Sequence, residues 1–299
     1  MSNPCLQSSS LPEVARARPR GLGIQVSTSS IRQVLNDAGY YWLPRAKKPK
    51  YSTKDKNARR EFVESVLEMS PAQLKAKLSM AMDGVVLSVP PTAAEQRAAY
   101  CRNGDSHVWR KEGEALDEDL VGRGNYSHQL PLDRAVPLWG GISEKGVAPV
   151  TFHASKKLTA EEWEDVVRSG GLVKALREVQ PDQKKGPWSI LCDNERFLNA
   201  AKSREAYAKS DIRLWQIPAR SPDLNPIEKY WAWLRRHLRQ MDLEDLAKKK
   251  PALTKAQYVK RVRGVLQTNK SKEVAQNVIR NFRKQCKAVS DKKGGAARG

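Results

Sequence analysis

Residues 188–194 read Trp-Ser-Ile-Leu-Cys-Asp-Asn, a short apolar run that ends in an acid and an amide. This run predicts a buried β-strand over Trp188–Cys192, which carries Asp193 to its C-terminal end. In open α/β sheets, ligands bind outside the C-terminal ends of the strands. Asp193 is therefore a candidate site residue, although an aspartate in this position is also common as a cap of the next turn.

A second stretch, Ser-Pro-Asp-Leu-Asn-Pro-Ile-Glu at residues 221–228, is a proline-rich loop that leads into a helix. We expect Asn225 to cap this helix and Pro226 to occupy its first position, which fixes Glu228 in the first turn. The helix dipole favours a carboxylate there, so Glu228 alone has a purely structural explanation. Asp193 and Glu228 are separated by 34 residues.

The surrounding sequence predicts an α/β fold, in which a mixed sheet is flanked by helices. Further strands are expected at Met80–Val89, Val136–Ile142, Val147–His153 and Ile212–Ile217, with a turn at residues 143–146 between the middle two. Helices are expected from a capping box at Thr159 and Glu162 to about Val179, near Leu198–Ala208, and again over 243–285.

The N-terminal part is predicted to be helical. Ser27 is a natural N-cap, Gly39 a natural stop, and the apolar face between them consists of Ile31, Val34, Leu35 and Ala38. A second helix follows Ser52 and Thr53, with apolar residues at helical spacing, namely Ala58, Phe62, Val63, Val66 and Leu67. Pro71 restarts a third, short helix.

Composition divides the chain into five predicted segments. These are a disordered N-terminus at 1–23, a helical segment with a basic linker, together a candidate nucleic-acid-binding region, at 24–78, the α/β domain at 79–242, a basic helical region at 243–285, and a disordered basic tail at 286–299.

The charge is concentrated at the two ends of the chain. Of the net charge of +21, residues 1–82 contribute +8 and residues 229–299 contribute +15, whereas residues 83–228 sum to −2. Basic flanks attract a polyanion, of which nucleic acid is the first candidate and an anionic membrane surface the second. No apolar run has membrane-spanning length. The four cysteines lie far apart, which argues against a zinc site or a disulfide framework.

Together, the strand ending in Asp193, the 34-residue gap and the loop motif are similar to the catalytic region of mariner-superfamily transposases. Residues 139–143 (Trp-Gly-Gly-Ile-Ser) followed by Gly146 look like the family's central hairpin, and residues 25–62 look like the end of its helix-turn-helix region. The resemblance covers roughly residues 25–240 and implies a ribonuclease H-like fold for the α/β domain, preceded by a partial helix-turn-helix region.

The resemblance also implies a catalytic site of three carboxylates, Asp83, Asp193 and Glu228, that hold two Mg²⁺ (or Mn²⁺) ions. Hard divalent cations prefer oxygen ligands, and two such ions suit phosphodiester chemistry. For Asp83 an alternative remains, because Asp-Gly is also a strong hairpin signal. Other candidates for the first acid lie in polar sequence, at Asp105, Asp117 and Asp119.

The function implied by the resemblance is DNA strand cleavage and strand transfer at transposon ends. It implies double-stranded DNA as partner, a homodimer, nuclear residence in a eukaryote, and neither a membrane nor a nucleotide cofactor. The basic or polar residues expected to contact DNA are Arg32, Gln33, Arg45, Lys47, Lys48, Arg235 and Arg236.

Two other functions stay open. The chain departs from the family pattern at Gly84, where glutamate is usual, and near Phe197 and Leu198, where a histidine is common. Its N-terminal region is also short. These departures favour a DNA-binding protein without catalysis, either decayed or co-opted. A ribonuclease H-like nuclease acting on RNA or hybrids is the third possibility, against which the loop motif counts.

Overall fold

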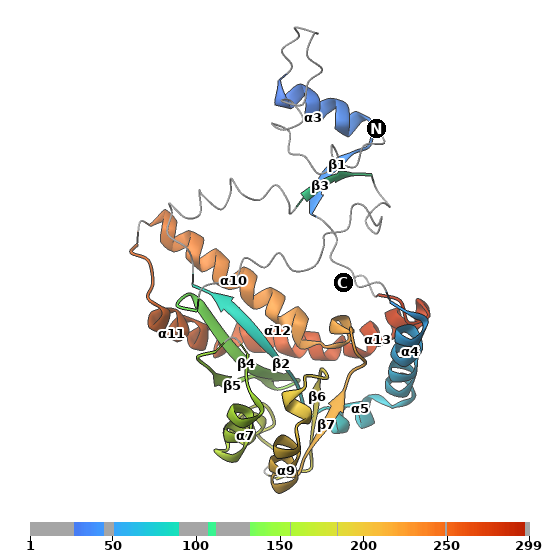
Figure 1. The fold of residues 1–299 in the computed structure, drawn as a ribbon, viewed down its shortest axis with the longest axis vertical. Coiled ribbons are helices and arrows are strands. Elements are labelled where there is room, and N and C mark those ends of the chain that lie inside the picture. Colours follow the sequence, from blue (N-terminus) through green and yellow to red (C-terminus); the bar gives the residue numbers. More distant parts are fainter. Residues whose placement is uncertain are drawn as a thin grey trace. The chain divides into compact units, whose positions relative to one another are not determined.

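The structure, a computed structural model, describes residues 27–44, 51–89, 107–111, 132–155, 157–183, 185–248 and 250–296 (Figure 1). Its contacts divide the chain into two units, one formed by Met1–Lys50 and Pro91–His128 and the other by Tyr51–Pro90 and Gln129–Gly299. Each unit is described by itself. None of the helices in the described ranges is long and apolar enough to cross a membrane.

In the smaller unit, helix α3 (Thr28–Asp37) begins as predicted, because the Ser27 hydroxyl accepts a hydrogen bond from the Ser30 amide at 3.0 Å. Gly39 follows it in a left-handed conformation. The predicted apolar face is only partly correct, since Leu35 is buried while Val34 is 65% exposed. Strands β1 (Tyr41–Pro44) and β3 (His107–Arg110) pair antiparallel, a ribbon that the sequence pattern did not predict.

The larger unit contains a five-stranded sheet in the order β5-β4-β2-β6-β7. Its strands are β2 (Met80–Ser88), β4 (Ala135–Ser143), β5 (Gly146–Phe152), β6 (Trp188–Cys192) and β7 (Ile212–Gln216). Strand β6 runs parallel to both of its neighbours, whereas β4 runs antiparallel to both of its own. The mixed sheet is as predicted, and each strand end lies within one residue of its expected position.

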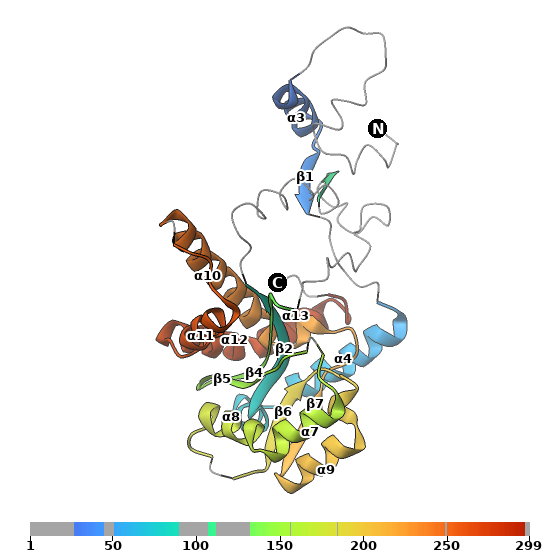
Figure 2. The ribbon, with the colours of Figure 1, turned by 60° about the vertical axis from the view of Figure 1, so that its left-hand side comes forward.

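Helices cover both faces of this sheet (Figures 1 and 2). One hydrophobic core joins the sheet to α7 (Ala160–Arg168), α8 (Gly171–Val179) and α9 (Ala201–Lys209). A second core joins the other face to α4 (Thr53–Glu68) and to the C-terminal helices α10 (Ile227–Ala247), α11 (Lys255–Leu266), α12 (Asn269–Arg280) and α13 (Phe282–Asp291).

The helix expected from Thr159 to Val179 is two helices. The capping box of Thr159 and Glu162 opens α7 as predicted. The chain then breaks at Gly170, whose φ of 82° is left-handed, and α8 begins anew at Gly171. Because the chain is interrupted at Gly170, α7 and α8 are separate helices, and the apolar face of each packs into the core on this side of the sheet.

Helices α4 and α5 (Pro71–Lys77) belong to the larger unit and not to a separate DNA-binding segment ending at residue 78. Phe62 and Val63 of α4 lie in the core shared with α10–α13, as their spacing predicted. Ala58, which was expected on this face, is exposed, and Arg59 is fully buried instead.

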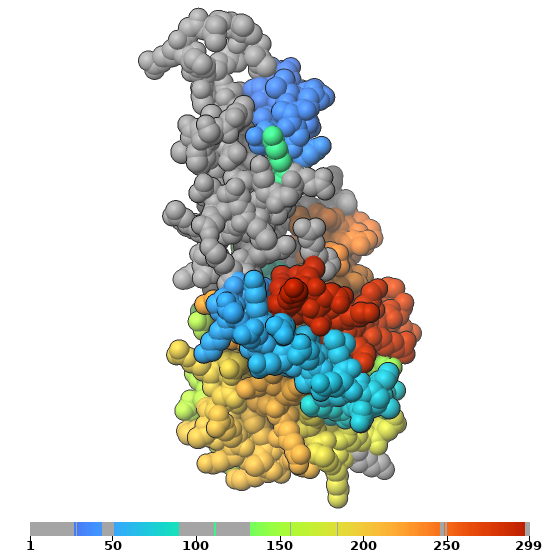
Figure 3. Space-filling view, turned by 90° about the vertical axis from the view of Figure 1, so that its right-hand side faces the viewer, coloured from blue at the N-terminus to red at the C-terminus, as the bar shows by residue number. Residues whose placement is uncertain are grey.

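The C-terminal segment is folded well beyond the predicted boundary. Residues 286–296 were expected to be disordered, but α13 continues to Asp291, and Cys286 and Val289 are buried in the core. Figure 3 shows α13 (red) beside α4 and α5 (blue to cyan) on one face of the molecule. The basic composition of this segment describes its outer face, whereas its inner face is apolar.

Candidate active site

Parallel pairing between β2 and β6 places two acids at the same level of the sheet. Ala81 lies opposite Leu191, and the same register continued by two residues brings Asp83 level with Asp193, the first residue after β6. Side chains alternate between the faces of a strand. Because Ala81 and Leu191 both belong to the core shared with α10, Asp83 and Asp193 are directed to the face that α10 covers.

Asp83 lies inside β2, as the strand expected over Met80–Val89 implies. The strand continues past it because β2 stays paired with β4 as far as Ser88. Asp83 and Gly84 lie opposite Gly140 and Trp139 in this ladder, so the alternative reading of Asp-Gly as a hairpin turn is wrong. The rival acids Asp105, Asp117 and Asp119 lie outside the described residues.

The third acid comes from the loop after β7. This loop contains the short 3₁₀ helix η4 (Pro222–Leu224), and Glu228 is the second residue of α10. Helix α10 can approach the sheet closely because Gly140 has no side chain: a Cβ there would lie 2.9 Å from the ring of Trp231. Glycine at this position of the central hairpin therefore has a packing reason.

The sequence predicted that the side chain of Asn225 caps α10, but the structure shows that it does not. The Glu228 amide donates to the Asn225 backbone carbonyl at 3.2 Å. The side-chain amide of Asn225 instead donates to the Met82 carbonyl at 3.4 Å, and its Oδ1 is buried without a partner. Asn225 thus ties the loop to β2, one residue before Asp83.

The three predicted acids line one cavity of about 370 Å³. The loop after β7 supplies most of the remaining wall, and the other lining residues are Asn194, Glu195, Ile217, Pro218, Ala219, Arg220, Ser221, Pro222 and Asn225. Asp83, Asp193 and Glu228 come from two strands and a helix that are far apart in sequence, and the fold brings all three together.

Burial and mutual repulsion disfavour the charged forms of the two aspartates. Burial, followed by the negative charges of Glu228 and Asp193, raises the pKa of Asp83 to about 8. Burial, followed by the charge of Glu195, raises the pKa of Asp193 to about 6. Within the described residues, no lysine or arginine forms an ion pair with Asp83, Asp193 or Glu228. The cavity therefore gathers three acids whose negative charge is not compensated by an ion pair with any lysine or arginine of the described residues.

These residues fit a hard divalent cation. One oxygen of Asp193, Oδ1, is buried without a hydrogen-bond partner, and such an orphaned carboxylate oxygen is costly unless a cation faces it. In the described part of the chain, no group of three or more histidine, cysteine, aspartate or glutamate side chains is placed so that it could hold a metal ion by itself. Mg²⁺ does not need one, since it usually keeps water and substrate phosphate among its ligands.

The two departures from the family pattern meet at one aromatic cluster on the opposite face of the sheet. A Cβ on Gly84 would lie 2.8 Å from the indole of Trp139. Trp139 in turn contacts Phe197, with ring centroids 5.3 Å apart, and Leu198 is fully buried nearby. A larger side chain at position 84, or a polar one at positions 197 and 198, would disrupt this aromatic and apolar packing.

The described residues predicted to contact DNA belong to two different units of the chain. Arg32 and Gln33 are exposed on α3 in the smaller unit, and the Gln33 amide donates to Asp37 at 2.9 Å. Arg235 and Arg236 are exposed on α10 in the larger unit. Arg45, Lys47 and Lys48 lie outside the described residues.

Sequence reasoning missed the buried ion pair between Arg59 and Asp223, which adjoins the cavity loop. A signal was available for Arg59, because positions 59, 62, 63 and 66 share one face of a helix. A charged residue on an apolar face calls for a buried partner. No local pattern identified Asp223 as that partner.

The chain is similar to known transposases in sequence and in structure. The family described as DDE superfamily endonuclease matches residues 103–248, which include Asp193 and Glu228 but not Asp83. The transposase of transposable element Tcb1 from Caenorhabditis briggsae is 22% identical over 282 residues, covering 90% of this chain and 86% of the relative. The Tc3 transposase of Caenorhabditis elegans is 32% identical over 101 residues, which are 34% of this chain and 29% of that protein.

Among solved structures, the chain is similar to the Mos1 transposase paired-end complex with the left transposon end, with a TM-score of 0.56 at 13% identity over 91% of this chain and 72% of that one. The catalytic domain of the Mos1 mariner transposase gives a TM-score of 0.54 at 12% identity and is covered to 99%. Other Mos1 structures are paired-end complexes with Mn or with Mg. This likeness confirms the predicted ribonuclease H-like fold.

Proposed function

The chain is a relative of the mariner-superfamily DDE transposases, and from that premise we propose that it cuts and joins DNA strands at transposon ends with the help of divalent metal ions. The observation that carries the proposal is the convergence of Asp83, Asp193 and Glu228 on one cavity, where no lysine or arginine of the described residues forms an ion pair with them.

Asp83, Asp193 and Glu228 would hold the metal, for which we propose two Mg²⁺ or Mn²⁺ ions. Bound at these oxygens, the ions supply activation of the attacking oxygen and stabilisation of the departing 3′-oxygen. In cleavage, a water oxygen attacks the phosphorus and the bond to the DNA 3′-oxygen breaks. In strand transfer, the freed 3′-hydroxyl attacks a target phosphate and displaces the 3′-oxygen of the target strand.

The chain's own groups prepare this step. The sheet fixes Asp83 and Asp193 beside each other, and α10 presents Glu228 to them. Arg220, at the rim of the cavity, has a side chain that is 64% exposed and lies only loosely, at 3.7 Å, from Asp55. It is suited to receive a DNA phosphate as the backbone enters.

The proposal includes double-stranded DNA as the partner and a homodimer, because two transposon ends must be brought together. It also includes nuclear residence in a eukaryotic host. The named relatives support it, since both are transposases of nematode elements, and the Mos1 structures contain paired transposon ends. We propose no nucleotide cofactor, because neither step needs an energy source. Hydrolysis of a phosphodiester is downhill, and strand transfer exchanges one phosphodiester bond for another.

Nicking of a supercoiled plasmid by the purified protein, with Mg²⁺ or Mn²⁺ and beside Glu228→Gln, tests this function. We expect metal-dependent nicking that falls by more than about 100-fold in Glu228→Gln, a larger loss than removal of a metal ligand's supporting partner causes. Asp182→Asn is the control, because its side chain is 82% exposed and is not among the residues that line the cavity. Retained DNA binding without nicking by the wild type would instead support the co-opted, non-catalytic DNA-binding function.

A further inference from the structure

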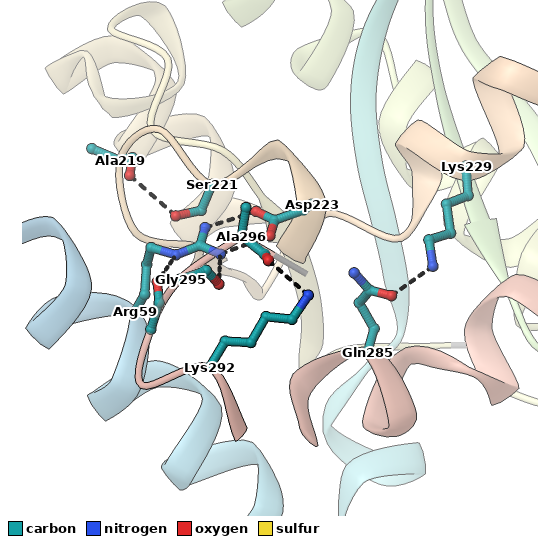
Figure 4. Close-up of polar contacts among 10 residues, drawn as sticks. Arg59, Ala219, Ser221, Asp223, Lys229, Gln285, Lys292, Gly295 and Ala296 are labelled. Atoms are coloured by element: carbon teal, nitrogen blue, oxygen red, sulfur yellow. Dashed lines mark hydrogen bonds and ion pairs between the residues drawn. The ribbon is translucent and has the colours of Figure 1, made fainter. Parts of the chain in front are cut away.

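A buried arginine holds the loop that forms the wall of the candidate active site. Arg59 of α4 is 0% exposed, and its guanidinium donates to both carboxylate oxygens of Asp223 at 2.7 Å (Figure 4). It also lies over the ring of Tyr51, 4.4 Å from the centroid. Asp223 belongs to η4, between the cavity residues Pro222 and Asn225. The loop is therefore fixed from behind by a side chain that lines no part of the cavity.

Two further donors of Arg59 bind the turn that follows α13. Its Nε donates to the Gly294 carbonyl at 2.8 Å and its Nη2 to the Gly295 carbonyl at 3.3 Å. The turn is closed by Lys292, whose ammonium group donates to the Ala296 carbonyl at 3.2 Å. One guanidinium thus joins helix α4, the cavity loop and the C-terminal turn.

The turn itself is seated tightly on α4. Gly294 has a left-handed φ of 82°, and a Cβ at this position would lie 2.3 Å from the Lys56 carbonyl oxygen. At the other end of α13, the Arg283 guanidinium donates to the carbonyls of Val66, Leu67 and Met69, at the end of α4. These contacts at both ends mean that the two helices run antiparallel, and Figure 3 shows them side by side.

Helix α13 also holds the other end of the loop. The ammonium group of Lys229, the residue after Glu228, donates to Gln285 at 2.6 Å (Figure 4). The segment between Asp223 and Lys229 contains Asn225 and Glu228, so both of its ends are bound to the α4–α13 pair.

We propose that Arg59 is a positioning residue for the metal-binding carboxylates, and that it acts together with the C-terminal turn at residues 292–295. We call Arg59 and this turn the loop brace. The brace keeps the loop after β7, and with it Glu228, in the place that metal binding requires. The inference rests on the proposed function, since it assigns a role in the same site.

The chemistry of the contact explains why arginine and glycine are used. A planar guanidinium has five donors in a fixed arrangement and can bind a carboxylate in bidentate fashion while still bonding to carbonyls. A lysine keeps the charge but cannot make this set of contacts. Only glycine adopts the left-handed turn of residue 294 and leaves room for Lys56.

Two variants separate the brace from general stability. Arg59→Lys weakens it at the guanidinium, and Gly294→Ala unseats the turn without changing Arg59. The matched control is Arg261→Lys, because Arg261 is also largely buried, with a side chain 14% exposed, and pairs with Asp242 at 2.7 Å and with Asp245 between α10 and α11. All three changes disturb buried contacts, but only the first two reach the loop.

Hydrogen–deuterium exchange of the full-length proteins, without metal, tests the positioning directly. We expect peptides covering residues 217–225 to exchange at least about 10-fold faster in Arg59→Lys and Gly294→Ala, because local opening follows the loss of buried contacts. In Arg261→Lys the same peptides should exchange as in the wild type. Unchanged exchange in both brace variants overturns the inference, whatever the protein's activity.

Mn²⁺ binding, measured by electron paramagnetic resonance without DNA, tests the consequence for the site. We expect the Kd for Mn²⁺ to rise about 10- to 100-fold in the brace variants, the range typical of losing a ligand's supporting partner, and saturating Mn²⁺ to restore much of the nicking rate. Wild-type affinity in brace variants that are merely less stable contradicts the inference. A wild type that binds no Mn²⁺ contradicts the proposed function instead, and loop exchange then still decides the brace.

Discussion

Asp223, in the loop after β7, and Glu228, in the first turn of α10, lie five residues apart, yet their carboxylates have opposite surroundings. Asp223 is neutralised by Arg59 through two hydrogen bonds of 2.7 Å. Glu228 faces Asp83 and Asp193 across the cavity, where no lysine or arginine among the described residues pairs with them. The acid that holds the loop in place, Asp223, is thus paired with an arginine, whereas the acids that face the cavity have no such partner among the described residues. This difference separates a structural acid from acids that are kept for a ligand.

Removing the cation from the compensated acid should have the largest effect on stability. Arg59→Met is expected to lower the free energy of unfolding by about 3 kcal/mol, because breaking a buried pair leaves a carboxylate without a partner. Urea denaturation measures this loss. The adjacent Arg60→Met is the control, since Arg60 is 49% exposed and forms a loose surface pair with Glu64 at 3.8 Å. A loss below about 1 kcal/mol for Arg59→Met would mean that the pair contributes little, as surface pairs do.

Neutralising an uncompensated acid should act in the opposite direction. Asp83→Asn is expected to raise the free energy of unfolding at pH 8 without metal by about 1–2 kcal/mol, because it removes a buried charge repelled by two others. The same variant should lose metal-dependent nicking. Denaturation in the presence of EDTA, paired with a plasmid assay, reports both effects. If Asp83→Asn is destabilised, the two regions do not differ in the way described.

The pH dependence of stability should carry the same signature. Since the pKa of folded Asp83 is raised to about 8, the folded state binds more protons than the unfolded state below that pH, and stability falls as pH rises towards about 8. The slope should be of the order of 1 kcal/mol per pH unit. Thermal melts from about pH 6 to about pH 8 in EDTA should show a falling Tm that Asp83→Asn flattens. With excess Mn²⁺ the decline should weaken, because metal binds the ionised form.

The smallest effect is expected for charges that are neither paired nor gathered in the cavity. Arg235 and Arg236 are exposed on α10, and replacing both by glutamine should weaken DNA binding uniformly across sequences. Each lost phosphate contact should lower the slope of log K against log salt by about one. Filter binding at several salt concentrations measures it. Arg168→Gln on α7 is the control, and an equal change there would leave α10 without a specific role.

Much of the fold was predictable because its signals are local. Short apolar segments marked the strands of the large sheet, and capping residues such as Thr159 and Glu162 marked helix starts. Asp193 and Glu228 were identifiable because a strand end and a proline-rich loop each have a recognisable sequence. The position of Asp83 beside Asp193 could not be predicted from local sequence. It depends on the pairing of β2 with β6, which lies more than a hundred residues later in the chain.

What could not be predicted depends on contacts between distant segments. The burial of Arg59 follows from Asp223 and from carbonyls of the C-terminal turn, none of which are its neighbours in sequence. The basic composition of residues 286–296 predicted disorder, whereas one apolar face, with Cys286 and Val289, is enough to fold the segment onto α4. Net charge describes the solvent side of such a helix and says nothing of its buried side.

The loop brace makes residues 294 and 295 part of the support for acids that lie much earlier in the sequence. A stop codon or frameshift before codon 294 leaves every acid codon intact but removes the glycines whose carbonyls complete the shell around Arg59. Among genomic copies of such an element, intact acids alone would not identify the copies able to move. A reading frame that stays open through codon 295 would be the additional mark of a mobile copy.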